Sequence, residues 1–372
     1  MAESTRLVDL VQRELDRFLA DHHDRLQAIS PDLDPFIEFS RALLSGGKRF
    51  RALFCYWGWQ AVTGYDEFDP LAEPSEHPDL NAAVKASAAL ELFHAAALVH
   101  DDIMDNSDTR RGMPSAHRRF ESLHAGAEWQ GNGRHFGQSG ALLLGDLLLG
   151  WSDELLDDGL RSLRSPDAAH SARAEFTRMR AEVTAGQYLD MLEEVSWRHG
   201  DEADSLERTR RVIVYKSAKY TVEAPLAIGG SLGGASLAQF AALRDFGLPL
   251  GVAYQLRDDV LGVFGDEHIT GKPSGDDLRE GKHTTLIAIA RRRLPSPARR
   301  LLDELLGDPS LDQHQIEMLQ TTIRDSGALA DVEHLIADHV SEAVAALDGA
   351  PLSTAATREF RRLADSVASR ES

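Results

Sequence analysis

The sequence predicts an all-α fold that forms a single domain over residues 1–372. Nearly every long segment carries apolar residues at the three- and four-residue spacing of one helix face, and no convincing run alternates as a strand does. Hydrophobic residues make up 42% of the chain, which is enough for a large core. No internal repeat, linker or low-complexity tract divides the sequence, so we expect one body of packed helices.

The first half of the chain alternates helical stripes with polar breaks. Residues 6–26 place their leucines, valine and phenylalanine on one stripe, and residues 84–105 are so rich in alanine and leucine that this helix should be buried on most sides. A further helix is expected from about Lys48, directly after two glycines. Residues 66–78 and 128–138 are polar and carry proline or glycine, so they predict loops.

The second half continues the helical pattern. The predicted helices there cover residues 140–156, 174–195, 206–229 and 237–264. Pro225 and Pro249 mark expected kinks, because proline has no N–H to donate. Residues 265–281 predict a loop, and helices resume from Thr284 without any further chemical motif.

Composition excludes several classes of function. The formal net charge of −20 argues against nucleic acid as a partner. Cys55 is the only cysteine, so no intrachain disulfide can form. The N-terminal segment has no apolar signal core, and the most apolar stretch, residues 141–149, is too short to span a bilayer. We therefore expect a cytoplasmic protein that is not an integral membrane protein.

Three carboxylates end the long helix predicted over residues 84–105. Asp101 and Asp105 are four residues apart and share a face, while Asp102 lies about 100° round and can reach a metal from the side. Carboxylates are unfavourable at a helix C-terminus because the helix dipole is negative there. The cluster therefore predicts Mg²⁺ that shares its coordination with phosphate oxygens. The alternative is an acidic helix end that only water solvates.

A second acidic pair, Asp258 and Asp259, lies inside the apolar pattern of residues 237–264. Gln255 is one turn back, on the face of Asp258. Gly262 stands where a third carboxylate would complete the spacing. Taken alone, such a pair is more often a surface feature. The first cluster, together with the lysines that follow the pair, Lys272 and Lys282, favours a second metal position.

The basic residues suggest where a phosphate would bind. Arg110 and Arg111 follow the first cluster, and guanidinium pairs suit phosphate oxygens. Lys48 and Arg51 are expected on one face at a helix N-terminus, which attracts anions. His94 lies two turns before Asp101 on the same face. The alternatives are ordinary loop solvation, a glycine turn into a basic helix, and a structural histidine.

These motifs, in this order, resemble the trans-isoprenyl diphosphate synthase (polyprenyl synthetase) family. The resemblance spans a motif-bearing core of about residues 40–290 and implies the isoprenoid synthase helical bundle around a central apolar cavity. It matches Asp101, Asp102 and Asp105 to the first aspartate-rich motif, and Asp258 and Asp259 to the second. Gly262 departs from the pattern because the family usually carries a last aspartate there, although some bacterial members have the same glycine, so an active enzyme is still expected.

The resemblance also implies roles for single residues. Three Mg²⁺ ions would be held by Asp101, Asp102, Asp105, Asp258 and Asp259. The homoallylic (isopentenyl) diphosphate would bind Lys48, Arg51, His94 and Arg111. The allylic diphosphate would bind Arg110, Lys216, Lys272 and Lys282. Gln187 and Asp190 would lie near the metal side, and Ser217 stands where threonine is usual. Family members are expected to be homodimers.

The implied chemistry is ionisation, condensation and elimination. The metal ions with Lys216, Lys272 and Arg110 would stabilise the departing diphosphate, and Gln255 and Ser217 would stabilise an allylic carbocation by their dipoles. No protein base or covalent nucleophile is needed. The expected activity joins isopentenyl diphosphate to allylic diphosphates and gives linear all-trans products.

Product length should depend on the helix that carries the first cluster. Ala96 and Ala97 lie just over one turn behind Asp101 and would leave room for a growing tail. Phe93 lies roughly 12 Å from Asp101 along the axis and is either the floor of that space or core packing. The pattern predicts geranylgeranyl diphosphate, with farnesyl or longer products as the alternative.

Two rival functions remain open. A terpene cyclase or head-to-head prenyl synthase could share the all-α architecture, but a cyclase has no need of the second diphosphate site that Lys48, Arg51 and Arg111 suggest. A non-catalytic regulatory subunit of a prenyl synthase would be expected to lose aspartates from the first cluster, and here all three are present.

Overall fold

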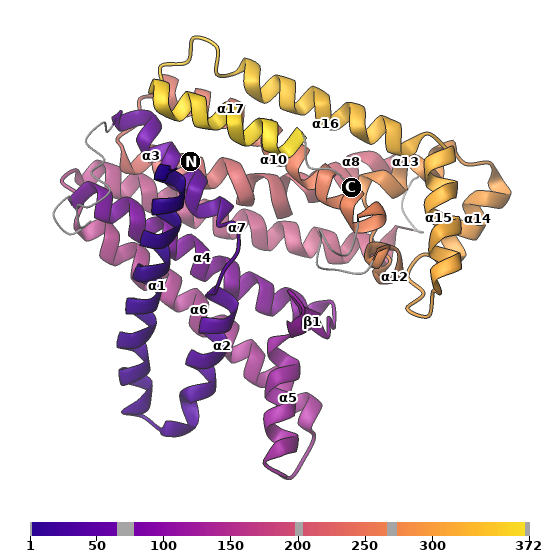
Figure 1. The fold of residues 1–372 in the computed structure, drawn as a ribbon, viewed down its shortest axis with the longest axis horizontal. Helices are drawn as coiled ribbons and strands as arrows, with labels where there is room; N and C mark the ends of the chain where they lie inside the picture. Colours follow the sequence, from indigo (N-terminus) through magenta and orange to yellow (C-terminus); the bar gives the residue numbers. More distant parts are fainter. Residues whose placement is uncertain (1, 65–77, 198–203, 266–273, 369–372) are drawn as a thin grey trace. The chain divides into compact units, whose positions relative to one another are not determined.

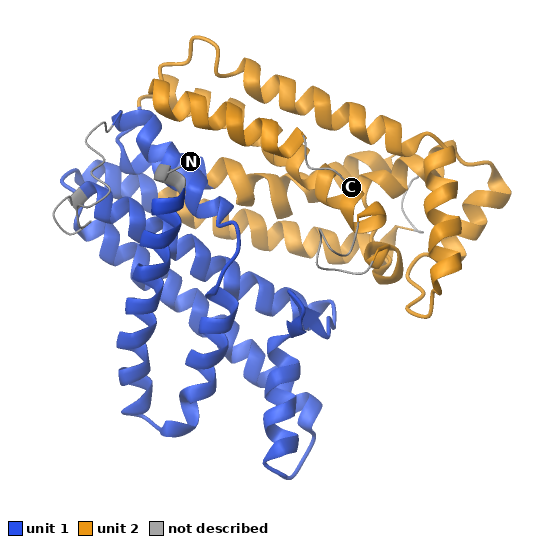
Figure 2. Ribbon diagram, in the orientation of Figure 1, with its two compact units in different colours: residues 1–173, 225–235 blue, residues 174–224, 236–372 orange. Residues whose placement is uncertain are grey.

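The computed structural model describes residues 2–64, 78–197, 204–265 and 274–368. Within these ranges the chain is helical apart from one two-stranded hairpin, which confirms the all-α prediction (Figure 1). The chain forms two compact units (Figure 2). Unit 1 comprises Met1–Arg173 and Pro225–Ala235, and unit 2 comprises Ala174–Ala224 and Ser236–Ser372. The single domain expected over residues 1–372 stays a prediction.

The elements of the first half are α1 (Ala2–Gln27), η1 (Pro31–Leu33), α2 (Asp34–Leu44), α3 (Phe50–Thr63), α4 (Pro78–Met104), β1 (Thr109–Arg110), β2 (Met113–Pro114), α5 (Ala116–Gly126), α6 (Gly133–Arg161) and α7 (Pro166–Ser196). Those of the second half are α8 (Ser205–Val212), η4 (Ile213–Glu223), α9 (Ala224–Leu232), α10 (Leu237–Phe264), α12 (Asp276–Glu280), α13 (Thr285–Arg293), α14 (Ser296–Leu305), α15 (Gln313–Asp325), α16 (Ala328–Ala345) and α17 (Thr354–Ala368).

Unit 1 is built around α4, whose most extensive packing is against α6 (Figure 1). This helix is apolar on nearly all sides, as expected of a helix buried all round. Leu90 and Leu92 have no exposed surface. Helices α1 and α3 also pack against α4.

Unit 2 is built around α10, which packs against η4 and α16. Phe246 on α10 stacks on Phe360 on α17, with ring centroids 4.9 Å apart. Nearer the second acidic pair, both Nη atoms of Arg257 donate to the two carboxylate oxygens of Glu333 on α16, at 2.6 and 2.7 Å. This bidentate pair fixes the last turns of α10 to α16.

Some predicted boundaries were wrong. The helix expected from about Lys48 begins at Phe50, because Gly46, Gly47 and Arg49 adopt left-handed backbone conformations. The loop expected over residues 128–138 ends at Asn132, whose side chain accepts from the backbone N–H of His135 and starts α6. The loop expected over residues 265–281 contains α12. The loop at residues 66–78 lies almost wholly outside the described residues.

The helix predicted over residues 206–229 is divided into three segments. Its central part, η4, is an eleven-residue π-helix that carries Lys216 and Ser217. Neighbouring helices approach it closely: a Cβ on Gly186 of α7 would lie 2.4 Å from the backbone N of Lys216, and one on Gly251 of α10 would lie 2.5 Å from the carbonyl oxygen of Ala218. Glycine at both positions lets α7 and α10 hold the wide π turn.

One helix meets the length and composition expected of a membrane span among the described residues, and it is not the stretch at residues 141–149. It is Asp79–Met104, the main part of α4, and 83% of its most apolar window is buried inside the protein. The core helix of a globular protein has the same properties, so this finding is weak evidence for a membrane span.

Candidate active site

The first acidic cluster is held at the end of α4 in unit 1. Helix α4 ends at Met104, and the N–H of Asp105 donates to the carbonyl oxygen of Asp101 at 2.8 Å, so Asp105 continues the last turn. Asp101 and Asp105 are half-buried, whereas Asp102 is only 1% exposed. The three carboxylates are therefore not equivalent: two face partly outward and one is enclosed.

Arg110 closes over this cluster from the hairpin. Its Nε donates to Oδ1 of Asp102 at 2.9 Å, its Nη2 donates to the same oxygen, and Nη2 lies 3.6 Å from Oδ2 of Asp101. The polar loop expected here is a hairpin whose two turn residues, Arg111 and Gly112, have φ of 53° and 74°. Positive φ at both positions is the geometry of a type I′ turn, which suits two short strands.

The Gly46–Arg51 segment places its basic residues differently from the prediction. Lys48 precedes α3 and is exposed, so it does not share a helix face with Arg51. Arg49 is buried and pairs with Glu91 at 3.2 Å. The second oxygen of Glu91 accepts from the backbone N–H of Ala52 at 3.4 Å. One of the helix N-terminal donors expected to attract a phosphate is thus already bound to a carboxylate.

A group of cations gathers around His94 in unit 1. The pKa of His94 is lowered well below 6.5, first by burial and then by the charges of Arg51, Arg111, Arg110 and Arg49. The pKa of Arg111 is also lowered, mainly by burial; Glu91 opposes this, while Arg49, Arg110 and Arg51 add to it. Like charges held this close favour an anion beside them.

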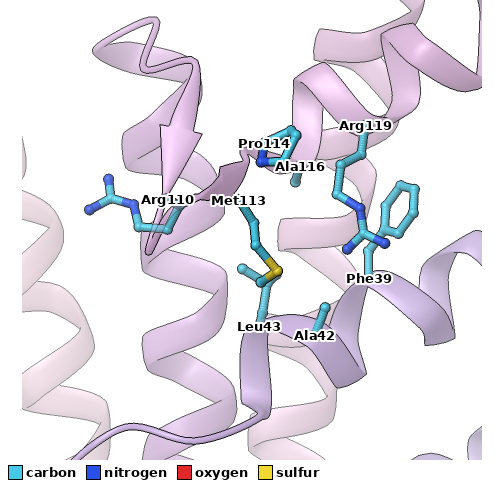
Figure 3. Close-up of a pocket in the computed structure, with 8 residues that line it drawn as sticks. All are labelled: Phe39, Ala42, Leu43, Arg110, Met113, Pro114, Ala116 and Arg119. Carbon is cyan, nitrogen blue, oxygen red and sulfur yellow. The ribbon is translucent and has the colours of Figure 1, made fainter. Parts of the chain in front are cut away.

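The hairpin also encloses a small pocket with α2 and α5 (Figure 3). It is lined by Phe39, Ala42, Leu43, Arg110, Met113, Pro114, Ala116 and Arg119. Arg119 lies 3.8 Å above the ring of Phe39 and pairs with Glu38 at 2.8 Å. Arg111 donates to the carbonyl oxygen of Leu43 at 3.4 Å. The two contacts of Arg119 join α5 to α2, and the contact of Arg111 joins the hairpin turn to α2.

The residues proposed to set product length differ in exposure. His94, Ala97 and Asp101 are all half-buried and follow one another at helical spacing, so they form one accessible stripe of α4. Ala96 has no exposed surface, and Phe93 is only 4% exposed. Ala97 therefore lies on the face of the acidic cluster, whereas Ala96 and Phe93 lie in packed surroundings.

Unit 2 carries the other basic groups. Lys216 on η4 pairs with Asp190 on α7, and Ser217 follows it on the same π-helix, half-buried. Lys282 lies 3.4 Å from Oδ1 of Asp277 and 2.5 Å from Oε2 of Glu280. Lys272 lies outside the described residues, so its predicted role is not tested.

The second acidic pair is split by burial. Asp258 is exposed, and Asp259 is 6% exposed. The amide of Gln255 donates to Oδ1 of Asp259 at 2.8 Å. Burial raises the pKa of Asp259 well above its usual range, and the carboxylates of Asp277 and Asp258 add to the rise. Among the described residues, no three acidic, histidine or cysteine side chains gather closely enough to hold a metal ion, so a cation at this pair stays a prediction.

Asp277 was not among the site residues predicted from the sequence. A Cβ on Gly262 would lie 2.0 Å from Oδ2 of Asp277, so this carboxylate fills the space beside the glycine. Glycine in place of the expected third aspartate was the available signal. The sequence alone does not indicate which side chain fills that space. Whether the two acidic clusters act together, as the sequence predicts, stays a prediction.

Comparisons with known proteins agree with these features. A family model described as polyprenyl synthetase matches residues 35–323. A geranylgeranyl diphosphate synthase of Sulfolobus acidocaldarius is 31% identical, over 77% of this chain and 76% of the relative. A geranylfarnesyl diphosphate synthase of Aeropyrum pernix is 29% identical, over 95% of this chain and 96% of the relative.

A solved structure covers almost the whole chain. It is a geranylgeranyl pyrophosphate synthase from Corynebacterium glutamicum, crystallised with isoprenyl diphosphate and magnesium. Its chain is 35% identical, and the match covers 98% of this chain and 99% of that one with a TM-score of 0.89. The helical architecture thus has a structural counterpart over nearly the whole chain.

Proposed function

The chain belongs to the polyprenyl synthetase family and is a trans-prenyltransferase, and we propose that its main product is geranylgeranyl diphosphate. The proposed reaction joins isopentenyl diphosphate to an allylic diphosphate and releases diphosphate. Two relatives named as geranylgeranyl diphosphate synthases support the twenty-carbon product. The relative named as a geranylfarnesyl diphosphate synthase keeps a longer product as the second candidate.

The observation that carries this proposal is the cationic group around His94. Arg51, Arg111, Arg110 and Arg49 all lower the pKa of this imidazole, so four guanidinium groups lie near it. Glu91 offsets part of this charge at Arg49 and Asp102 offsets part of it at Arg110; the remainder is a local positive field in a chain whose formal charge is −20. A diphosphate beside Arg51, Arg111 and His94 fits this field, and we expect Lys48 to bind it as well. A cyclase, with one diphosphate to bind, has no use for such a second anion site.

A divalent cation fits the acidic residues present. Asp101, Asp105 and Asp258 are at least partly exposed carboxylates and could hold Mg²⁺, while Asp102 and Asp259 are enclosed and hydrogen-bonded. We expect three Mg²⁺ ions. When bound, they supply positive charge that stabilises diphosphate as a leaving group. Asp102 and Asp259 contribute by holding Arg110 and Gln255 in place.

The remaining steps belong to the chain and its substrates. Arg110, Lys216, Lys272 and Lys282 bind the allylic diphosphate and stabilise it as the C–O bond breaks and the electron pair leaves with it. The half-buried Gln255 and Ser217 offer dipoles to the allylic cation. The double bond of isopentenyl diphosphate then forms the new C–C bond, and a proton passes to the released diphosphate. No protein nucleophile takes part.

Three expectations complete the proposal. We expect a homodimer. We also expect a cytoplasmic location, which agrees with a single cysteine that is buried and forms no disulfide. We also expect catalysis by this chain alone, because the first cluster keeps all three aspartates, which a regulatory subunit of a prenyl synthase would not require.

One experiment tests the function. The purified chain is incubated with Mg²⁺, isopentenyl diphosphate and each of the five-, ten- and fifteen-carbon allylic primers, and the products are separated by chromatography. We expect linear twenty-carbon diphosphate as the main product from every accepted primer. A dominant longer product would favour the second candidate, and cyclic products or no turnover would contradict the proposal.

A further inference from the structure

We propose that Trp197 is a positioning residue for the allylic diphosphate site, because its ring holds His283 and so fixes the backbone from which Lys282 extends. This inference rests on the proposed function, in which Lys282 binds the allylic diphosphate. It gives a role in substrate binding to an aromatic side chain at the end of α7.

The first argument is how short the segment around Lys282 is. Helix α12 ends with Gly281 as its C-cap, in a left-handed conformation at φ 77°. Helix α13 begins with Thr284 as its N-cap, and the Thr284 side chain accepts a hydrogen bond from the backbone of the first turn. Lys282 and His283 are the two residues that connect these caps. In so short a connection, the placement of His283 sets the direction in which Lys282 extends.

The second argument is the contact between Trp197 and His283. Their ring centroids lie 4.0 Å apart with 30° between the ring planes, so the imidazole faces the indole. Both residues are half-buried. An aromatic pair in close contact contributes stability beyond the area that it buries. Because the two rings come from distant segments of unit 2, their contact joins the Lys282 segment to the end of α7.

The third argument is that Trp197 is itself held in place. Its N–H donates to the carbonyl oxygen of Glu193 at 3.1 Å, so it continues the last turn of α7. Cζ of Arg291 on α13 lies 4.5 Å from the centre of the Trp197 ring. Arg291 in turn donates to both carboxylate oxygens of Asp303 on α14, at 2.7 and 3.2 Å. The indole is therefore a fixed support for His283.

The fourth argument is that α8 connects to both partners of this contact. At the end of α7, Nε of Arg208 donates to the buried carboxylate of Glu193 at 2.8 Å. At the start of α13, the hydroxyl of Thr285 donates to that of Thr209 at 3.1 Å, and both threonines are buried. The two segments that carry the stacked rings are thus bound to the same helix.

A positioning role predicts a particular kinetic result. Without the indole, the Lys282 segment should occupy several conformations, and the apparent affinity for the substrate falls with the fraction that remains competent to bind. The stabilisation typical of an aromatic pair corresponds to a change of about two- to tenfold in that fraction. Saturating substrate restores the competent conformation. KM for the allylic diphosphate should therefore rise about two- to tenfold, while kcat changes little.

The first test compares KM and kcat of wild type, Trp197→Leu, His283→Ala and Trp197→Phe. The first two variants each remove one ring and should raise KM, whereas Trp197→Phe keeps a ring and should stay closer to wild type. The control Phe360→Leu removes another aromatic contact of unit 2, with Phe246, and should lower stability to urea without raising KM. A wild-type KM in Trp197→Leu, or an equal rise in Phe360→Leu, would overturn the inference.

A double variant tests whether Trp197 acts through Lys282. Lys282→Ala should raise KM and also lower kcat, because it removes a charge that stabilises the departing diphosphate. If Trp197 acts by placing this lysine, Trp197→Leu should raise KM by less than about twofold once Lys282 is alanine. Effects that multiply in the double variant would show that Trp197 acts independently of Lys282 and would refute the positioning role.

A further readout needs no turnover. Trypsin cleaves after lysine, and the rate of cleavage between Lys282 and His283 reports how often this segment opens. Mass spectrometry should find this cleavage about two- to tenfold faster in Trp197→Leu than in wild type. An unchanged rate would contradict the inference. Wild type that makes no prenyl product would contradict the proposed function instead, and the trypsin comparison would still decide whether Trp197 holds the segment.

Discussion

The guanidinium of Arg110 donates from both Nε and Nη2 to a single oxygen, Oδ1 of the buried Asp102. This contact joins the hairpin to the end of α4. Asp102, the middle aspartate of the first cluster, thus binds an arginine, a role that its spacing does not suggest. Asp101 and Asp105 remain partly exposed.

The Arg110–Asp102 pair should matter for stability. Arg110→Gln leaves the Asp102 carboxylate, 1% exposed, without the guanidinium that compensates its charge. Since the arginine is 20% exposed, we expect a loss near the lower limit for buried pairs, about 3 kcal/mol of unfolding free energy. Urea denaturation measures this. The double variant Asp102→Asn/Arg110→Gln should lose less than the sum of the two single variants; additive losses would refute the coupling.

Product length should respond to Ala97. Ala97→Phe places a bulky ring on the accessible stripe of α4 that also carries Asp101, so it should block a growing tail early. We expect the longest product to shorten by at least one five-carbon unit, measured by chromatography with the same primers. Ala97→Ser is the control and should leave product length unchanged. A variant whose longest product matches that of wild type would place the tail elsewhere.

His94 should make stability depend on pH. Its pKa in the folded protein is lowered well below 6.5, so the unfolded chain binds the proton more readily. Where the unfolded state binds more protons, stability rises with pH. Stability should therefore fall as the pH drops from about 6.5 toward the lowered pKa, by up to about 1.4 kcal/mol per pH unit from this group.

The measurement is urea denaturation of wild type and His94→Gln at several pH values between neutral and mildly acidic. The variant should lose part of the slope, because glutamine does not titrate. His135→Gln, a change at an exposed histidine, controls for the substitution itself. Equal slopes in wild type and His94→Gln would show that folding does not lower the pKa of this imidazole.

The buried pair of Arg49 and Glu91 should be costly to break. Their side chains are 2% and 9% exposed, and Glu91 also accepts from the N–H of Ala52. Glu91→Gln leaves the Arg49 charge buried, so we expect a loss of about 3–5 kcal/mol. Glu207→Gln is the comparison, because its pair with Arg211 is about half exposed and should be worth less than about 1 kcal/mol. Similar losses in the two variants would contradict the buried-pair argument.

Local sequence signals were sufficient where local interactions decide the structure. Helix α10 begins and ends at the predicted residues because Ser236 and Gln239 form a capping box at its start and Gly265 follows its end. The buried helix α4 and the acidic end that it carries were also predictable, since both depend on composition and spacing along one segment.

Contacts between distant segments were not predictable in this way. The left-handed Arg49 breaks the helix expected from Lys48, and its side chain bonds to Glu91, far along the chain. The π-helix η4 depends on close approach by α7 and α10. The carboxylate beside Gly262 comes from α12, and no pattern within α10 reveals it.

The gathering of arginines around His94 has a consequence for how a polyphosphate reaches the protein. Far from the surface the molecule repels such an anion, because its formal charge is −20, whereas close to the arginines it attracts it. Dissolved ions screen the distant repulsion first, over a length of about 8 Å at physiological strength. The rate of capture should therefore rise with the first additions of salt and fall only at higher concentration, so that its profile passes through a maximum.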